Sequence, residues 1–315
     1  MRTHDYLLIS LLVMILALTF PLISLQAGAE ELAEFDDTYV IAEGSWPGIQ
    51  VKNEVIRQVL GTLGYDFETE FLGQPMIYEG MSQGDIDFYL GSWMPEEAGM
   101  REGHEEGYEV ISTQLDDAVY MSAVPEYVYE AGVQCHSDIA EHAEKFDHTL
   151  HAGAHGEGAD EILTRAVEED IYGLEGWEIV NADWPATVAE AEQAIEDEEW
   201  IVFPGWQPHW MNVLLDVEYL DDPKNIWGED SSVIENLVHP DLQERAPQLY
   251  QILENFQIES DHQSRWVFEY DQEDREMEEV AEEWIEDNLD IVADWLAGAA
   301  AEDGRDAVEV INENF

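Results

Sequence analysis

The regular alternation of strand-like and helix-like segments is the feature that most constrains the fold. Residues 38–42 form a short apolar run that predicts a buried strand. The next segment carries apolar residues at helical spacing: Val55, Ile56, Val59, Leu60 and Leu63. Residues 67–72 and 86–90 predict two more strands, with a short helix at 76–82 between them. This βαβαβ pattern is typical of a mainly parallel sheet covered by helices.

A second unit of the same kind follows along the chain. Its expected elements are a strand at 149–151, a glycine-rich turn, a helix at 160–168, a strand at 177–180, a helix at 186–195 and a strand at 200–203. Beyond it we expect a strand at 214–220 and then mostly helices, including 280–296. The sequence therefore predicts an α/β protein of two lobes.

The division into lobes follows from where the two units end. We expect lobe 1 to comprise residues 30–122 together with 212–315, and lobe 2 to comprise 123–211. No long Pro- or Ser-rich linker separates the two units, so the chain should cross between them in short hinge segments near 120–124 and 203–211. Such an architecture can close on a ligand.

The first 29 residues predict a signal peptide. An apolar stretch at 6–25 precedes Ala27, Gly28 and Ala29, and small residues of this kind favour cleavage after Ala29. The stretch has about 20 residues, so an uncleaved anchor is the alternative on length alone. The expected location is the periplasm. The single Cys135 excludes an intramolecular disulfide.

The charge balance is extreme, with 11 Lys and Arg against 73 Asp and Glu, for a formal net charge of −62. A field of this sign repels polyanions and excludes a nucleic-acid binder that neutralises phosphates. The 45% hydrophobic content and the 11 Trp exclude a disordered acidic tail. Binding of polycations or metals is one explanation of the acidity. Because the acids are scattered through every segment, we favour adaptation to molar salt, which predicts a fold that loosens at low salt.

Three Trp residues follow predicted strands, where open α/β sheets bind their ligands. Trp46, Trp93 and Trp206 each stand within two residues of a Gly or Pro at such a strand end. We expect them to form a cage, with Tyr120 at the first crossing as a fourth wall. Aromatic faces suit a quaternary ammonium group, and each contributes about 0.5–2 kcal/mol when desolvated. The alternatives are core or interface tryptophans and a buried hinge tyrosine.

Several segments resemble one known family, the substrate-binding proteins of ABC importers for glycine betaine, choline and related osmolytes. The segments that carry the resemblance are 84–95, 123–129, 201–210 and 283–288. The resemblance implies a two-lobed type II periplasmic-binding-protein fold with a ligand clamped at the hinge. It also implies an aromatic box, which corresponds here to Trp46, Trp93 and Trp206 with Tyr120, and a permease in the membrane as partner.

The chain departs from its relatives where they contact the other end of the ligand. Betaine-binding relatives often have a His a few residues beyond the Trp that matches Trp93, where this chain has Glu96, Glu97 and Ala98. Choline-binding relatives tend to have an Asp where this chain has Gly48. The sequence therefore leaves the preferred ligand open.

A glycine-rich turn at 154–158 is the expected site for a ligand carboxylate. Backbone N–H groups at the start of a helix bind anions, and this turn, which includes Gly156 and Glu157, leads into the helix expected at 160–168. His155 or His209 could add a donor, although a structural role is the alternative for both.

A zinc site is the competing prediction. His148, His151 and His155 lie within eight residues, with Glu157 and Asp160 nearby, and could serve a metal-dependent hydrolase. The run crosses from a predicted strand into a turn, so the three rings need not share a face. The chain also lacks the His-Glu-x-x-His, Gly-x-Ser-x-Gly and phosphate-loop motifs of common enzymes.

The sequence as a whole therefore predicts an exported, non-catalytic protein that captures glycine betaine or a related quaternary ammonium compound and delivers it to an ABC permease. We expect a monomer without cofactor, metal or nucleic acid. A choline-binding protein of the same type is the first alternative, and the zinc-dependent hydrolase is the alternative from a different class.

Overall fold

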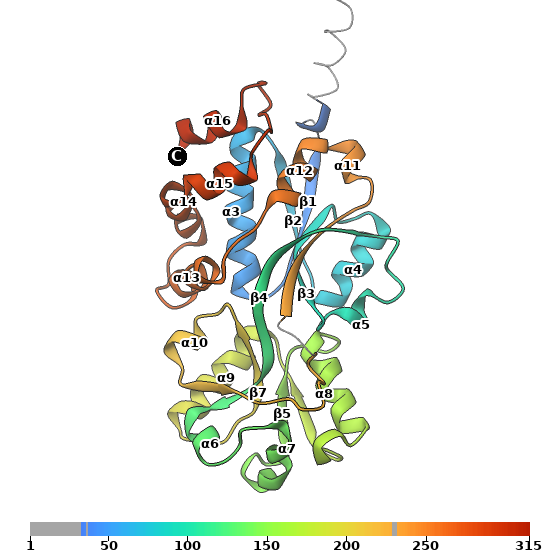
Figure 1. The fold of residues 1–315 in the computed structure, drawn as a ribbon, viewed down its shortest axis with the longest axis vertical. Coiled ribbons are helices and arrows are strands. Elements are labelled where there is room, and N and C mark those ends of the chain that lie inside the picture. Colours follow the sequence, from blue (N-terminus) through green and yellow to red (C-terminus); the bar gives the residue numbers. More distant parts are fainter. Residues whose placement is uncertain (1–32, 36, 229–231) are drawn as a thin grey trace, which may run out of the picture.

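The computed structural model describes residues 33–35, 37–228 and 232–315 as two lobes arranged along the long axis of the molecule (Figure 1). The expected signal peptide at 1–29 lies outside the described residues. Among the residues that are described, no helix is long and apolar enough to cross a membrane.

Lobe 1 is built on a sheet whose strands run in the order β2-β1-β3-β9-β4. The bounds of these strands are β1 Thr38–Glu43, β2 Asp66–Phe71, β3 Phe88–Met94, β4 Glu109–Pro125 and β9 Ser232–Val238. β1 pairs in parallel with β2 and β3, whereas β9 is antiparallel to both β3 and β4. The predicted βαβαβ unit is therefore present, with two antiparallel strands added to it.

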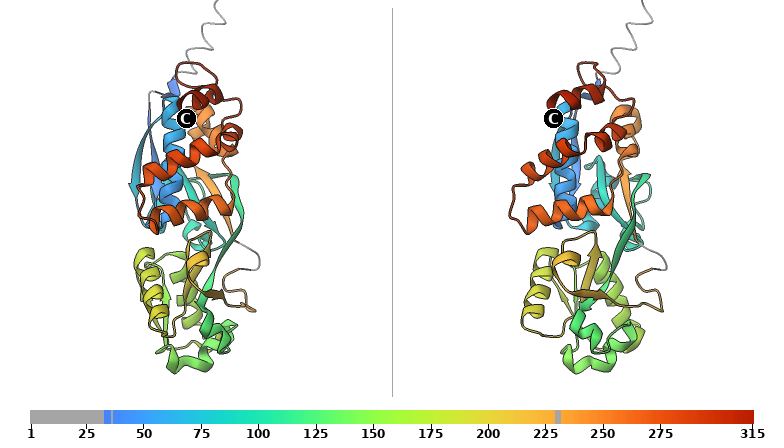
Figure 2. Two further views of the ribbon diagram at one scale, coloured as in Figure 1. Left: turned by 90° about the vertical axis from the view of Figure 1, so that its left-hand side faces the viewer. Right: turned by 60° about the vertical axis from the view of Figure 1, so that its left-hand side comes forward.

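Helices flank this sheet, as two rotated views make clear (Figure 2). They are α3 Pro47–Leu63, α4 Gln74–Gln83, α5 Ala98–Arg101, α11 Leu242–Arg245, α12 Pro247–Asn255, α13 Ser260–Asp271, α14 Met277–Asp287, α15 Leu289–Trp295 and α16 Ala307–Asn314, after a short 3-10 turn at Ala33–Phe35. α3 begins with Pro47, whose fixed φ suits a first helical turn, and ends at Gly64 with φ 109°. Its five predicted apolar positions are all buried.

Lobe 2 has a smaller set of strands and helices. Its elements are α6 Glu126–Glu130, α7 His136–Ile139, β5 Thr149–Ala152, α8 Gly158–Glu168, β6 Glu178–Asn181, α9 Trp184–Glu196, β7 Phe203–Gln207, α10 Met211–Leu214 and β8 Val217–Tyr219, with 3-10 helices at Ala140–Lys145 and Ile171–Gly173. β5 and β6 are parallel, and β7 and β8 are antiparallel to the end of β4.

The long strand β4 carries the chain from lobe 1 into lobe 2 (Figure 1). It pairs with β9 as far as Ala118 and with β7 from Val119 onward. The return crossing differs from the expectation at 203–211. β8 still pairs with β4, and Trp227 Nε1 donates to His136 Nε2 over 3.0 Å, so the segment up to Trp227 packs on lobe 2. The chain enters the lobe 1 sheet again at Ser232.

Two expected elements need correction. β7 starts at Phe203 and not at residue 200, and the strand expected at 214–220 is the short helix α10 followed by the three-residue β8. The chain beyond it is mostly helical, as expected, but it also adds the strand β9 to the lobe 1 sheet.

Candidate functional site

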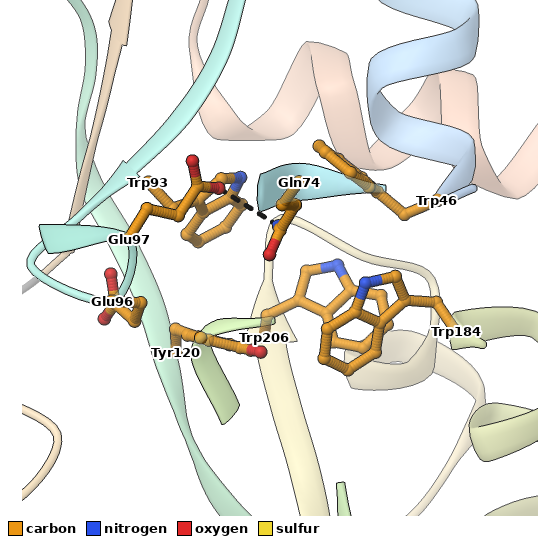
Figure 3. A pocket seen from close by; sticks show the side chains of 9 residues that line it. Trp46, Gln74, Trp93, Glu96, Glu97, Tyr120, Trp184 and Trp206 are labelled. Atoms are coloured by element: carbon orange, nitrogen blue, oxygen red, sulfur yellow. Dashed lines mark hydrogen bonds between the residues drawn. The ribbon is translucent and has the colours of Figure 1, made fainter. Parts of the chain in front are cut away.

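A pocket lies between the two lobes, with aromatic rings on several sides (Figure 3). It encloses about 340 Å³ of space between its lining atoms, part of it open to solvent. The residues that line it are Trp46, Gln74, Trp93, Glu96 and Glu97 from lobe 1, and Tyr120, Gly158, Trp184 and Trp206 from lobe 2. A mostly aromatic hollow with a few polar groups is typical of a small-molecule site.

Two glycines make room for the Trp46 ring. Trp46 directly precedes α3 and is 5% exposed. A Cβ atom on Gly44 would lie 1.9 Å from Trp46 Cζ3, and one on Gly91 would lie 3.2 Å from Trp46 Cζ2. The indole therefore lies against bare backbone, and a side chain at Gly44 would displace it.

The other rings of the pocket form a connected group. Tyr120 on β4 is the register partner of Trp206 on β7, so the antiparallel ladder holds these two side by side. Ring centroids are 5.9 Å apart for Trp93 and Tyr120, 6.0 Å for Tyr120 and Trp184, and 5.1 Å for Trp184 and Trp206. All four rings are nearly buried. Their contacts fix the shape of the hollow from both lobes.

The four predicted aromatic residues thus line one pocket, although their local positions differ from the expectation. Trp93 and Trp206 lie within β3 and β7 rather than after them, and only Trp46 follows its strand. A fifth ring, that of Trp184, the first residue of α9, was not predicted from the sequence. Trp184 precedes a Pro and follows β6, the same arrangement as Trp46 before Pro47, and this repeat was the available signal.

Two adjacent carboxyl groups, Glu96 and Glu97, form the polar side of the pocket. Burial raises the pKa of Glu96 to about 7 and that of Glu97 to about 8. Glu97 accepts hydrogen bonds from Tyr78 Oη and, over 3.0 Å, from Gln74 Nε2 (Figure 3). Glu96 accepts one from Ser232 Oγ. From the sequence these two residues were noted only because relatives often have a His in this segment. Their place in the pocket was not predicted.

The turn expected to hold a carboxylate already uses its amides. Ala154 N–H donates to Glu157 Oε2 over 3.3 Å, and Gly156 N–H donates to Asp160 Oδ2 over 2.8 Å. Burial raises the pKa of Glu157 to about 7. The His155 side chain is 85% exposed. His155, Gly156 and Glu157 do not line the pocket, so the expectation for this turn needs correction; only Gly158 reaches the pocket.

His209 is also outside the pocket lining, because it lies behind a cage residue. Its ring centroid is 4.5 Å from that of Trp206, and its Nδ1 accepts a hydrogen bond from Met211 N–H over 3.2 Å. Burial lowers the pKa of His209 to about 3, which keeps the ring neutral. Its position therefore fits support of the Trp206 ring rather than donation to a ligand.

The three histidines of the zinc prediction take separate partners. His148 packs against Trp177, with centroids 5.7 Å apart, while His151 Nδ1 lies 3.3 Å from Glu190 and His155 Nδ1 lies 3.6 Å from Asp160. Across the described ranges, no group of three or more His, Cys, Asp or Glu side chains is arranged to hold a metal ion. The zinc-dependent hydrolase is therefore not supported.

Comparison with known proteins agrees with this two-lobed architecture. The family described as the substrate binding domain of ABC-type glycine betaine transport systems matches residues 37–287. The chain belongs to this family. The resemblance stated from sequence segments is thereby confirmed.

Among curated relatives, the glycine betaine/carnitine transport binding protein GbuC of Listeria monocytogenes is 31% identical over 161 residues. The match covers 51% of this chain and 53% of GbuC, so it spans about half the length of that relative.

Solved structures of related fold include an ABC-transporter choline binding protein in complex with choline. It is 24% identical to this chain and has a TM-score of 0.84. The match covers 88% of this chain and 97% of the choline binding protein. Lactococcal OpuAC in its closed-liganded conformation with glycine betaine is 23% identical, with a TM-score of 0.76 and coverage of 99%, against 82% of this chain. These likenesses confirm the predicted two-lobed type II periplasmic-binding-protein fold.

Proposed function

We propose that this chain is an exported, non-catalytic binding protein that captures glycine betaine or a related quaternary ammonium compound and delivers it to the membrane permease of an ABC importer. Its proposed place of action is the periplasm, where it would work as a monomer in osmoprotection. Family membership and the aromatic pocket support this proposal.

The observation that carries the proposal is the convergence of five aromatic rings from two lobes on one hollow. A quaternary ammonium group has no N–H to donate, so ring faces are its best partners in a dry pocket. Five faces at about 0.5–2 kcal/mol each sum to about 2.5–10 kcal/mol. Micromolar affinity requires about 8 kcal/mol. The ring faces alone reach this value only at the upper end of the range, so lobe closure and the polar side of the pocket must contribute the rest.

Choline is the second candidate, and the polar side of the pocket favours it when the carboxyl groups there are ionised. Glu96 and Glu97 stand beside the cage, where a ligand carboxylate would need a hydrogen-bond donor. A hydroxyl, in contrast, donates to a carboxylate. The protonation state of Glu96 and Glu97 therefore bears on which of the two compounds the pocket prefers.

Calorimetric titration in high salt with glycine betaine and with choline tests the proposal. At least one of the two should bind the wild-type protein, and Trp93→Ala should weaken that binding about tenfold through the loss of one face. Trp200→Ala is the matched control, because Trp200 lies in lobe 2 and does not line the pocket. The centroid of its ring is 3.8 Å from Lys145 Nζ.

Two results would contradict the proposal. One is the absence of binding of either compound to a folded wild-type protein. The other is equal affinity of the wild type and Trp93→Ala, which would remove Trp93 from the cage.

A further inference from the structure

Two oxygen atoms at the edge of the cage are buried without a hydrogen-bond partner. They are Glu96 Oε2 and Gln74 Oε1, and both of their residues line the pocket. Gln74 donates its Nε2 to Glu97, which leaves its Oε1 as the free atom (Figure 3). Glu96 is 3% exposed and engages only its other oxygen, with Ser232. Unpaired buried acceptors are costly, so a ligand that brings a hydrogen-bond donor to this edge of the cage is favoured.

Glu96 lines the same pocket as the five aromatic rings. Burial raises the pKa of Tyr120, one wall of the cage. The nearby charges of Glu157, Glu96 and Glu97 raise it further. The start of α8 closes the other side, since a Cβ on Gly158 would lie 2.9 Å from the Glu96 carbonyl oxygen. A ligand whose ammonium group lies among the rings can therefore reach Glu96 with its second end.

We infer that Glu96 determines specificity by accepting a hydrogen bond from the far end of the ligand, so that the pocket prefers a quaternary ammonium alcohol of the choline class to a ligand that ends in a carboxylate. This inference rests on the proposed function, because it requires the cage to hold the ammonium group. The hydroxyl has one proton, and it donates this proton to the charged Glu96 in preference to the neutral Gln74 Oε1.

Protonation of Glu96 makes the preference depend on pH. Burial raises its pKa to about 7, while Ser232 and the backbone N–H of Glu96 lower it. Three other ionisable side chains lie around the pocket. Burial raises the pKa of Glu97, which lies beside Arg101, and that of Glu157, while burial of Tyr120 keeps its hydroxyl neutral over this range. A bound cation favours ionised Glu96, so choline should bind more tightly as the pH rises through about 7. A betaine carboxylate needs protonated Glu96, so its affinity should fall over the same range.

Titrations with choline and glycine betaine at about pH 6 and about pH 8.5, in high salt, test this inference. In the wild type the ratio of the betaine Kd to the choline Kd should increase with pH and exceed one at the higher pH. In Glu96→Gln this ratio at the higher pH should fall by about tenfold or more, because a charge-assisted hydrogen bond is lost and an amide donor for a carboxylate is gained.

Glu54→Gln is the matched control, since Glu54 lies on α3, pairs with Arg57 at 2.8 Å and does not line the pocket. This variant should leave the ratio unchanged, and thermal unfolding of both variants checks that each is folded. A wild type that prefers betaine at the higher pH, or a ratio that Glu96→Gln does not change, overturns the inference and leaves the cage intact. Failure of both ligands to bind the folded wild type overturns the proposed function itself.

Discussion

At the scale of single residues, Gly44 determines where one wall of the cage lies. We expect Gly44→Ala to weaken binding of the cage ligand by about tenfold or more, because the new Cβ would overlap the Trp46 ring 1.9 Å away. Calorimetric titration measures the loss. Gly61→Ala on α3 is the control, since nothing lies within 4 Å of a Cβ there and the variant should bind normally. Unchanged affinity in Gly44→Ala would mean that Trp46 does not contact the ligand.

Lys52 gives a second prediction at this scale, because its ammonium group is buried in lobe 1. Nζ donates to Leu90 O over 2.9 Å and to Gln114 Oε1 over 2.5 Å. Burial lowers the pKa of Lys52 from 10.5 to about 7. The unfolded chain therefore holds this proton more tightly than the folded protein does. Burial of charged Lys52 lowers the free energy of unfolding by its full amount below about pH 7, and this loss disappears as the pH approaches 10.5.

We therefore compare the free energy of unfolding of Lys52→Met with that of the wild type. The difference should favour the variant most at about pH 6 and should decrease steadily toward about pH 10. Denaturant unfolding across this range measures the difference. Arg57→Met on the same helix should give a difference independent of pH, because a guanidinium stays charged throughout. A pH-independent difference for Lys52→Met as well would contradict the assigned burial cost.

At the scale of secondary structure, the elements that the sequence predicted well are those with a clear period. β1 and α3 were expected because an apolar run is followed by buried positions at helical spacing. β9 and β4 were missed because polar residues occupy buried positions in them. Asn236 is fully buried on β9, where its Nδ2 donates to Leu253 O, Phe256 O and Ser112 Oγ. No periodicity in the sequence indicates that such an amide will be satisfied by the tertiary structure.

The site shows the same division between local and tertiary information. The cage residues Trp46, Trp93 and Trp206 could be predicted because each stands within two residues of a Gly or Pro near a strand end. The partners of the polar groups could not, since Ser232 reaches Glu96 from 136 residues further along the chain. The turn at 154–158 was expected to bind an anion, but its own Glu157 and Asp160 accept from its amides.

The start of α8 gives a prediction at the scale of elements, because it touches lobe 1 where Gly158 meets Glu96. A methyl group at Gly158 would lie 2.9 Å from Glu96 O and 3.1 Å from Glu96 Cβ. We expect Gly158→Ala to keep the lobes from closing fully, and so to weaken betaine and choline binding by a similar factor. Titration of both ligands measures this, and small-angle scattering should show a larger radius of gyration with ligand present. A change in the ratio of the two affinities would instead indicate a local effect on Glu96.

At the scale of the whole molecule, the dominant feature is charge that the fold does not pair. Among the described residues the ion pairs of Arg and Lys with carboxylates all involve Arg, at residues 57, 101, 245, 265, 275 and 305. These pairs account for a small part of 73 acidic residues. Most carboxylates therefore repel one another across the surface, and their repulsion acts over about 10 Å at 0.1 M salt but about 3 Å at 1 M.

This repulsion predicts that salt stabilises the closed, compact molecule. Between about 0.1 M and about 2 M NaCl we expect the midpoint of thermal unfolding to rise by on the order of 10 °C, because screening removes several kcal/mol of self-repulsion from a chain with a net charge of −62. Calorimetry or circular dichroism measures the midpoint. Sucrose at matched osmolality is the control, since it stabilises by exclusion from the surface without screening charge. An equal rise in sucrose, or no rise in NaCl, would mean that surface repulsion does not limit the stability of this protein, and the acidic surface would then need an explanation other than adaptation to salt.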